Sequence, residues 1–355
     1  MRIIISAGGT GGHIYPALSI VNKIKDKDKN AEILYVGTTD RMEKDIVPKY
    51  NIEYYAIKIR GIDRKLSLDN IRTVKYFVSA VKEMKKLMKK FKPDIVIGVG
   101  GYVTAPVIYA AHKLKIKTII HEQNSILGMT NKFLSKYVDA LCISFPDTKS
   151  KAKRVVYTGN PSSEDDNSIF DKKEFKLSDD KKLVLIVMGS LGSKVVNDKM
   201  KEILPKFNGK DYEVLFITGN DYFDEFNNLK LDKNIKIVSF VNNLKRVFKK
   251  TDVLVSRAGA TTMSEIISFK VPSILIPSPY VTDNHQYKNA MSLVEKDSAL
   301  LIEEKNLNSD ILISNIEKLL NDNKKINSIK NNLSMMSINN SASKIYDLIC
   351  EIVGE

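Results

Sequence analysis

Residues 2–13 read R-I-I-I-S-A-G-G-T-G-G-H, and this stretch decides the fold that the sequence predicts. The apolar run Ile3–Ile5 is typical of a buried parallel strand. Four glycines follow before His13, and Pro16 indicates the first turn of a helix over about 16–26. A strand, a glycine turn and a helix bring backbone N–H groups toward a phosphate or a sugar. The stretch therefore predicts a ligand-binding loop, with a plain glycine-rich turn and a solvent-facing histidine as the alternative.

Two common nucleotide-binding motifs do not fit this loop. The dinucleotide fingerprint G-x-G-x-x-G needs a glycine where the chain has Ile14. The next predicted strand, 32–36, is followed by Gly37-Thr38-Thr39 and lacks the acid that holds a ribose. The Gly-Lys-Ser/Thr sequence of a P-loop does not occur here either.

Strands and helices alternate along both halves of the chain. In the first half this predicts an α/β fold with a doubly wound parallel sheet, whose ligands bind at the carboxyl ends of the strands. A polar run after Thr158 indicates an inter-domain connection. The second half then repeats the opening, with an apolar strand at 183–187, a glycine loop at 188–193 and a helix from about Val195. Expected strands lie near 2–6, 32–36, 54–58, 95–98, 118–121, 140–143 and 155–157, and then near 183–187, 213–218, 235–238, 253–255, 273–276 and 299–302.

Charge is distributed unevenly along the chain. The formal net charge is +14, and residues 1–160 carry 29 basic and 14 acidic residues, whereas residues 161–355 carry 27 and 28. Such a basic half suits nucleic acid, an anionic membrane surface or an acidic substrate, with an ordinary lysine-rich surface as the alternative. The two cysteines suit a reducing cytosol, and we expect neither a signal peptide nor a membrane-spanning segment.

The segment 256–265, S-R-A-G-A-T-T-M-S-E, follows a predicted strand and opens a helix. Its first-turn N–H groups suit a diphosphate, and Glu265 suits the two hydroxyls of a ribose. The alternative is a capping box, in which Thr262 caps the helix and Glu265 completes the motif. We find no metal-ligand spacing among the four histidines and no nucleophile elbow. His112 and His121 are expected to be structural.

A long helix is predicted over 71–91, with an apolar stripe and a basic outer face. Its cationic residues are Arg72, Lys75, Lys82, Lys85, Lys86, Lys89 and Lys90. The simplest interpretation is a helix that packs on the core and exposes a solvated basic face. The alternative adds adsorption of that face to anionic lipid.

Several motifs together resemble one known family. They are 8–13 (G-G-T-G-G-H), 100–102 (G-G-Y), 121–124 (H-E-Q-N), 159–161 (G-N-P), 189–192 (G-S-L-G), the 256–265 group and 283–286 (D-N-H-Q). In this order along nearly the whole chain, they resemble the MurG family of bacterial peptidoglycan N-acetylglucosaminyltransferases. The resemblance implies a GT-B fold, in which two Rossmann-like domains face a cleft. It implies domains at 1–160 plus 338–355, on the acceptor and membrane side, and at 161–337, which binds UDP-GlcNAc.

The resemblance also implies a reaction. N-acetylglucosamine moves from UDP-GlcNAc to the C4 hydroxyl of MurNAc-pentapeptide on undecaprenyl diphosphate, with inversion. We expect no cofactor and no metal, because helix N-termini and glycine N–H groups can stabilise the departing diphosphate. The enzyme is expected at the cytoplasmic face of the bacterial membrane, as a peripheral protein. Residues carried over by position as substrate contacts are Thr10, Gly11, Gly12, Asn124, Ser190, Val241, Arg257, Ala260, Thr261, Thr262, Met263, Ser264, Glu265, His285 and Gln286.

The chain departs from the family pattern at two positions. Ser163 stands where some members carry an arginine that contacts the donor, so Arg257 or loop N–H groups are expected to do more. His285 stands where some members have a second glutamine.

Our hypothesis for the general base is His13, because an imidazole titrates near neutral pH. Glu122 is the second candidate, and Tyr102 is expected to position the acceptor.

Two rival functions remain open at this point. A UDP-GlcNAc 2-epimerase shares the fold and the nucleotide sugar. A basic nucleic-acid binder is disfavoured, since no interleaved aromatic platform is visible in the sequence.

Overall fold

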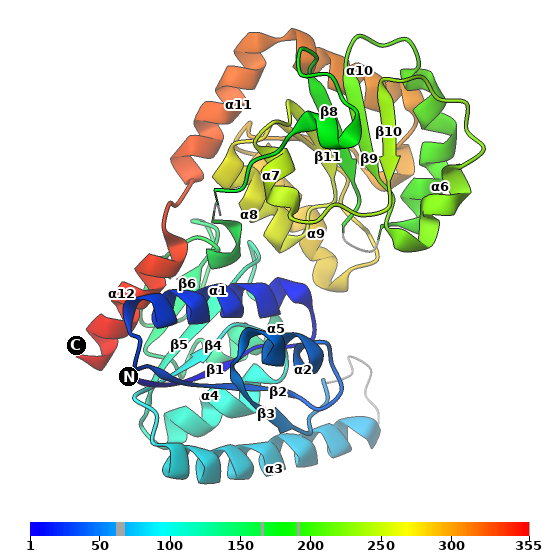
Figure 1. The fold of residues 1–355 in the computed structure, drawn as a ribbon. Coiled ribbons are helices and arrows are strands. Elements are labelled where there is room, and N and C mark those ends of the chain that lie inside the picture. Colours follow the sequence, from blue (N-terminus) through cyan, green and yellow to red (C-terminus); the bar gives the residue numbers. More distant parts are fainter. Residues whose placement is uncertain (62–67, 165–166, 190–191, 355) are drawn as a thin grey trace. The chain divides into compact units, whose positions relative to one another are not determined.

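The structure is a computed structural model that describes residues 1–61, 68–164, 167–189 and 192–354. The chain divides into two compact units (Figure 1). The first contains Met1–Glu164 and Ile338–Glu355, and the second contains Asp165–Ser337. The boundary expected from the sequence lies at residue 160.

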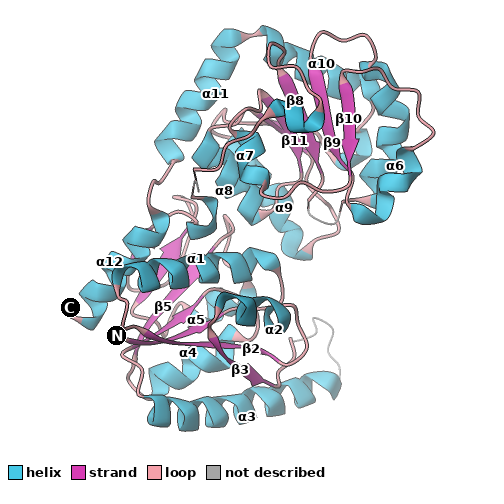
Figure 2. Ribbon diagram, viewed as in Figure 1, coloured by secondary structure: helices cyan, strands magenta, loops and turns pink. Residues whose placement is uncertain are grey.

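Within its described residues, the first unit is built on seven parallel strands in the order β3-β2-β1-β4-β5-β6-β7. Helices cover both faces of this sheet (Figure 2). The strands are β1 (Arg2–Ser6), β2 (Glu32–Thr38), β3 (Glu53–Ile57), β4 (Ile95–Gly98), β5 (Lys117–Glu122), β6 (Ala140–Ile143) and β7 (Val155–Tyr157). The α-helices are α1 (Gly11–Lys27), α2 (Glu43–Ile46), α3 (Leu68–Phe91), α4 (Thr104–Lys113), α5 (Met129–Leu134) and α12 (Ser341–Val353), and the 3-10 helices are η1 (Val47–Tyr50) and η2 (Pro161–Ser163).

Strand β1 shows why the sequence forms this sheet. Ile3 and Ile5 point to the face covered by α1 and α12, whereas Ile4 points to the face covered by α3 and α4. All three side chains are fully buried, as expected for a central parallel strand that is apolar on both sides.

Helix α1 begins at Gly11, five residues before the position that the sequence suggested. Thr10 is its N-cap in extended conformation, and Pro16 lies inside the helix. A proline at this position removes the N–H bond to the carbonyl of Gly12, one turn earlier, and its ring crowds that carbonyl. The expectation that Pro16 marks the first turn is therefore wrong, because the last two glycines continue into the helix instead of forming a turn.

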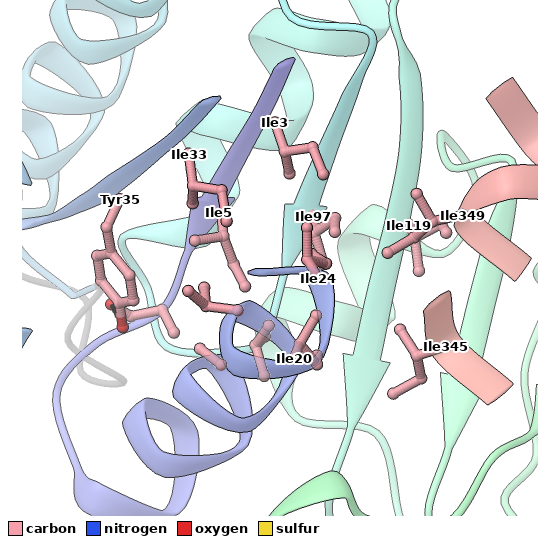
Figure 3. Close-up of a cluster of buried hydrophobic side chains, with 14 of the residues drawn as sticks. Ile3, Ile5, Ile20, Ile24, Ile33, Tyr35, Ile97, Ile119, Ile345 and Ile349 are labelled. Atoms are coloured by element: carbon pink, nitrogen blue, oxygen red, sulfur yellow. Dashed lines mark hydrogen bonds between the residues drawn. The ribbon is translucent and has the colours of Figure 1, made fainter. Parts of the chain in front are cut away.

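Helix α12 returns to the first unit after the chain has passed through the second. Ile345 and Ile349 are fully buried in the same core as Ile3 and Ile5 (Figure 3). Arg154 of the loop before β7 donates two hydrogen bonds of 2.7 Å to the carboxylate of Glu351. The last helix is thus part of the first hydrophobic core.

The described part of the second unit contains a sheet of six parallel strands in the order β10-β9-β8-β11-β12-β13. The strands are β8 (Leu183–Val187), β9 (Glu213–Ile217), β10 (Ile235–Val238), β11 (Val253–Ser256), β12 (Ser273–Leu275) and β13 (Leu300–Leu301). The α-helices are α6 (Lys194–Ile203), α7 (Leu244–Phe248), α8 (Ala260–Phe269), α9 (His285–Val294), α10 (Ser309–Asn321) and α11 (Asn323–Met336). The 3-10 helices are η3 (Lys172–Phe175), η4 (Leu204–Phe207), η5 (Asn220–Phe226), η6 (Thr282–Asn284) and η7 (Glu304–Asn306).

Each sheet reverses its strand order once, between β1 and β4 in the first unit and between β8 and β11 in the second. Ligands of open α/β sheets bind outside the carboxyl ends of the strands at such a switch point. The first glycine loop follows β1, and the 256–265 segment lies at the end of β11. Both predicted ligand loops therefore lie at switch points.

Candidate active site

The first glycine loop places a helix N-terminus at the switch point of the first unit. Thr10 is the N-cap of α1, with an extended backbone and an exposed side chain, and Gly11 and Gly12 begin the first turn of the helix. The N–H groups of a first helical turn lack intrahelical partners. They can donate to an anion or to sugar oxygens, as the sequence predicts for Thr10, Gly11 and Gly12.

A second glycine loop of the first unit, Gly100–Gly101 after β4, packs against the loop at Gly8–Gly12. Gly8 donates its N–H to the carbonyl oxygen of Gly100 over 3.2 Å. Gly100 and Gly101 both have positive φ, at +105° and +86°. A Cβ on Gly101 would lie 2.3 Å from the carbonyl oxygen of Gly8, and one on Gly100 would lie 2.5 Å from Cδ2 of His13. Only glycines allow the two loops to lie this close.

His13 lies in the first turn of α1 and is half-buried. Its Nδ1 lies 3.1 Å from the carbonyl oxygen of Gly8 and 3.4 Å from Oγ1 of Thr10. Because a carbonyl oxygen only accepts, we assign the proton of the neutral ring to Nδ1. Nε2 then carries the lone pair, which is the arrangement that a general base needs.

Glu43 is a site residue that the sequence analysis missed. Its fully buried carboxylate accepts from the N–H of Gly9 over 3.0 Å through Oε2. Oε1 accepts from the N–H and the hydroxyl of Thr38, over 3.1 and 2.6 Å. An acid shortly after the polar end of β2 is the available signal in the sequence, but the ribose ligand of a dinucleotide site is expected directly at the end of that strand.

Glu122, the second candidate base, is buried at the end of β5 with both oxygens engaged. Oε1 accepts from the backbone and side-chain nitrogens of Asn124, each over 3.0 Å. Oε2 accepts from the N–H of Gly128 and from Nδ2 of Asn131, each over 2.9 Å. Four donors therefore already surround this carboxylate. It orders the loop that carries Asn124.

Tyr102 and His121 lie beside these loops in different roles. The hydroxyl of Tyr102 accepts from Nε of Arg41 over 3.3 Å, which links two loops at this sheet edge. His121 is buried between the carbonyl of Gly159 and the side chain of Gln123, over 2.9 and 3.0 Å. Burial lowers the pKa of His121, so it is held neutral. Its contacts are those of a structural residue.

In the second unit, α8 begins at Ala260 with Gly259 as its N-cap, and no side chain caps it. The capping-box alternative is therefore wrong, because Thr262 lies inside the first turn. Ala260, Thr261 and Thr262 supply the first-turn N–H groups. The Met263 side chain is fully buried, so any contact from it to a ligand uses the backbone. The Ser264 hydroxyl donates to the carbonyl of Ala260 over 3.0 Å.

Glu265 is a buried carboxylate on the second turn of α8. Burial raises its pKa to about 7, against a smaller opposing effect of Lys245. A buried carboxylate gains strongly from hydroxyl donors. This environment suits the ribose diol that the sequence analysis assigned to Glu265.

Arg257, at the end of β11, turns its guanidinium into the protein. It donates to the carbonyl of Ile276 over 3.0 Å and to Oγ of Ser193 over 2.7 Å, and it pairs with the carboxylate of Glu304. Both charged side chains of this pair are buried. The expected direct contact of Arg257 with a donor stays a prediction, while its visible contacts tie three loops of this sheet edge together.

The remaining predicted residues lie on loops of the second unit. Val241 is buried after β10. His285 opens α9, and its Nδ1 lies 2.7 Å from the carbonyl of Thr282. The side-chain oxygen of Gln286 accepts from the N–H of Ser278 over 2.8 Å. Ser190 lies outside the described residues.

The described part of the chain contains no group of three or more His, Cys, Asp or Glu side chains that could hold a metal ion. Within the same residues, no helix is both long and apolar enough to cross a membrane.

Comparison with known proteins places the chain in a family. The N-terminal domain model of glycosyltransferase family 28 matches residues 3–143, and the C-terminal domain model matches residues 183–349. A Bacillus cereus protein is 44% identical over 362 residues, which cover 99% of this chain and 100% of the relative. It is named UDP-N-acetylglucosamine--N-acetylmuramyl-(pentapeptide) pyrophosphoryl-undecaprenol N-acetylglucosamine transferase 1.

The chain belongs to the MurG family of glycosyltransferases.

The crystal structure of MurG from Acinetobacter baumannii matches with a TM-score of 0.80 and 25% identity over 99% of both chains. As a MurG family member, the chain is a hexosyltransferase with the GT-B fold, so the predicted fold class is confirmed. A UDP-GlcNAc 2-epimerase from Neisseria meningitidis also matches, with a TM-score of 0.67 and 15% identity. That likeness shows a common fold only.

Proposed function

We propose that this enzyme transfers N-acetylglucosamine from UDP-GlcNAc to the C4 hydroxyl of MurNAc-pentapeptide on undecaprenyl diphosphate. The observation that carries this proposal is 44% identity along the whole chain to a relative whose name states that transfer. In the reaction the acceptor oxygen forms a bond to the anomeric carbon. The bond from that carbon to the phosphate oxygen breaks, UDP leaves with the electron pair, and the new linkage is β-1,4.

The second unit is proposed to bind the donor. The first turn of α8 offers N–H groups of Ala260 to Thr262 to the diphosphate, and Glu265 one turn later takes the ribose hydroxyls. Stabilising the departing diphosphate is the main electrostatic task of an inverting transferase. The buried Arg257–Glu304 pair supports this edge of the sheet.

The first unit is proposed to bind the acceptor, with His13 as the general base. Nε2 of His13 takes the proton of the C4 hydroxyl as that oxygen attacks. Tyr102 positions the acceptor beside the glycine loops, and the first-turn N–H groups of α1 face its diphosphate. Glu122 is a weaker candidate for the base, because four donors already surround its carboxylate.

We also propose that the first unit adsorbs to an anionic membrane through α3 and α5. Val74 and Val78 on α3 are 57% and 47% exposed, and Met129 and Phe133 at α5 are 56% and 43% exposed. Phe133 also contacts aromatic rings of α3, α4 and the chain after α5. Exposed apolar side chains within a basic surface are typical of interfacial binding. This surface would bring the enzyme to its lipid-linked substrate at the cytoplasmic face.

The test of the proposed function is transfer of labelled sugar from UDP-GlcNAc to a lipid-linked muramoyl acceptor, with and without a chelator. We expect a product that carries both sugars and UDP release that requires the acceptor. Acceptor-independent UDP release with formation of the 2-epimer would support the epimerase instead. Persistence of the product in chelator would agree with a reaction that requires no metal.

The test of membrane adsorption is sedimentation with phosphatidylglycerol vesicles. Lys85, Lys86 and Lys89 are replaced together by glutamate, and a control carries the same change at Lys206, Lys324 and Lys330 of the second unit. We expect binding to fall for the first triple variant only, and to weaken with salt. Replacing Val78 and Phe133 with serine should weaken binding at any salt concentration. Equal binding of all variants would contradict the assignment of this surface.

A further inference from the structure

The buried carboxylate of Glu43 and the imidazole of His13 hold the two ends of one peptide group. The N–H of Gly9 donates to Oε2 of Glu43 over 3.0 Å. The carbonyl oxygen of Gly8, which belongs to the same peptide group, lies 3.1 Å from Nδ1 of His13. The carboxylate, the peptide and the imidazole therefore form a continuous hydrogen-bonded chain.

We propose that Glu43 is a positioning residue that fixes the tautomer of His13 and raises the basicity of its Nε2 through the Gly8–Gly9 peptide group. This inference rests on the proposed function, in which His13 is the general base. Hydrogen bonds in a chain polarise one another, so a charged acceptor on the N–H makes the carbonyl at the other end a stronger acceptor. A stronger acceptor holds the proton on Nδ1, so the lone pair of the neutral ring lies on Nε2.

The position of His13 explains why such support is needed. The imidazole lies in the first turn of a 17-residue helix, and the positive end of that helix disfavours an imidazolium ion. A base in this position gains a proton in the transition state, so the local field opposes catalysis. A buried negative charge on the far side of the loop offsets that field.

The packing around Glu43 is built to keep the carboxylate in place. A Cβ on Gly8 would lie 2.4 Å from Oε1 of Glu43, and a Cβ on Gly37 would lie 2.8 Å from its Cγ. Thr38 supplies two of the three donors. The hydroxyl of Tyr54 donates to the carbonyl of Thr38 over 2.6 Å and so holds that residue.

Other titratable groups at this sheet edge do not replace Glu43. His121 of β5 is buried and neutral, and Glu122 accepts from the loop that carries Asn124. Tyr102 accepts from Arg41, which adds a positive charge to the neighbourhood. Among these groups, Glu43 is the carboxylate that accepts a hydrogen bond from the Gly8–Gly9 peptide group, which His13 also contacts.

The experiment compares Glu43→Gln with wild type and with Asp139→Asn. Asp139 is a matched control, because its carboxylate accepts from the N–H and the hydroxyl of Thr118, as Glu43 does from Thr38. It contacts the first residues of β5 and not the glycine loop. For Glu43→Gln we expect the acidic limb of the pH profile of kcat/KM to move down by on the order of one unit. We expect kcat to fall about tenfold or more, with a smaller change in the KM for UDP-GlcNAc.

A measurement that requires no activity keeps the two proposals separate. Nitrogen NMR of histidine-labelled wild-type protein should show His13 as the Nδ1–H tautomer, and Glu43→Gln should populate the other tautomer. A wild-type His13 that is mainly Nε2–H would overturn the inference, even if Glu43→Gln does not fold. So would a Glu43→Gln variant that loses stability but keeps the wild-type pH profile, as we expect for Asp139→Asn. A wild type that transfers no sugar, but shows the expected tautomer, would instead refute the proposed function.

Discussion

Replacing Gly101 with alanine should destabilise the first unit more than the same replacement at Gly9. The two residues have nearly equal positive φ angles, +86° for Gly101 and +89° for Gly9. An alanine in this region costs about 1–2 kcal/mol at either position. A Cβ on Gly9 meets no atom within 4 Å, whereas one on Gly101 lies 2.3 Å from the carbonyl oxygen of Gly8.

The contact between a Cβ on Gly101 and the carbonyl oxygen of Gly8 sets the expected difference in stability between the two variants. Because the carbonyl belongs to the backbone, the two loops must separate, and such overpacking costs about 1–3 kcal/mol more. We therefore expect Gly9→Ala to lose about 1–2 kcal/mol and Gly101→Ala about 2–5 kcal/mol, which is a large part of ordinary domain stability. Native-state hydrogen exchange of peptides from β1 and β4 reports on the first unit alone. Equal losses in the two variants would refute the argument that the glycine loops interlock at Gly8.

Three further predictions concern buried polar groups. Burial lowers the pKa of His121, so the unfolded chain binds a proton more readily than the folded one. The free energy of unfolding should therefore carry its full contribution from His121 above about pH 6.5 and decline as the pH falls. Urea titrations at several pH values can check that this dependence vanishes in His121→Gln. Burial raises the pKa of Glu265 to about 7, so its ionisation opposes folding as the pH rises through that value. Glu265→Gln should therefore stabilise the free protein near pH 8 by about 1–3 kcal/mol and weaken UDP binding in calorimetry. An unchanged affinity for UDP would remove Glu265 from the donor site. Arg257→Met should cost about 3–5 kcal/mol because it leaves Glu304 buried without its partner, whereas the double variant Arg257→Met/Glu304→Leu should cost less than the single one in thermal unfolding.

Most of the strands could be predicted because buried parallel strands give continuous apolar runs. The predicted runs at 95–98 and 140–143 agree with β4 and β6. The start of α1 could not be predicted in the same way. Glycine has a low helix propensity. Gly11 and Gly12 are nevertheless helical, because the loop at Gly100–Gly101 packs against Gly8 in the turn before them.

The site could be predicted only in part, for a related reason. Glycine loops and polar strand ends are local patterns, so His13 and the start of α8 could be identified from neighbouring residues. The role of Glu43 depends on a hydrogen bond to a residue 34 positions away, which no local pattern encodes. The same holds for Arg257, whose partners Ser193 and Glu304 come from distant loops.

The return of α12 to the first unit sets an order of events during synthesis. Strands β1 to β7 leave the ribosome well before Ile345 and Ile349, which fill one face of their core. Until then the nascent N-terminal unit exposes the apolar surface that these isoleucines later cover, while the second unit can complete its own core. A chain that stops before residue 341 would lose its last helix, and the damage would fall on the half of the protein that was made first.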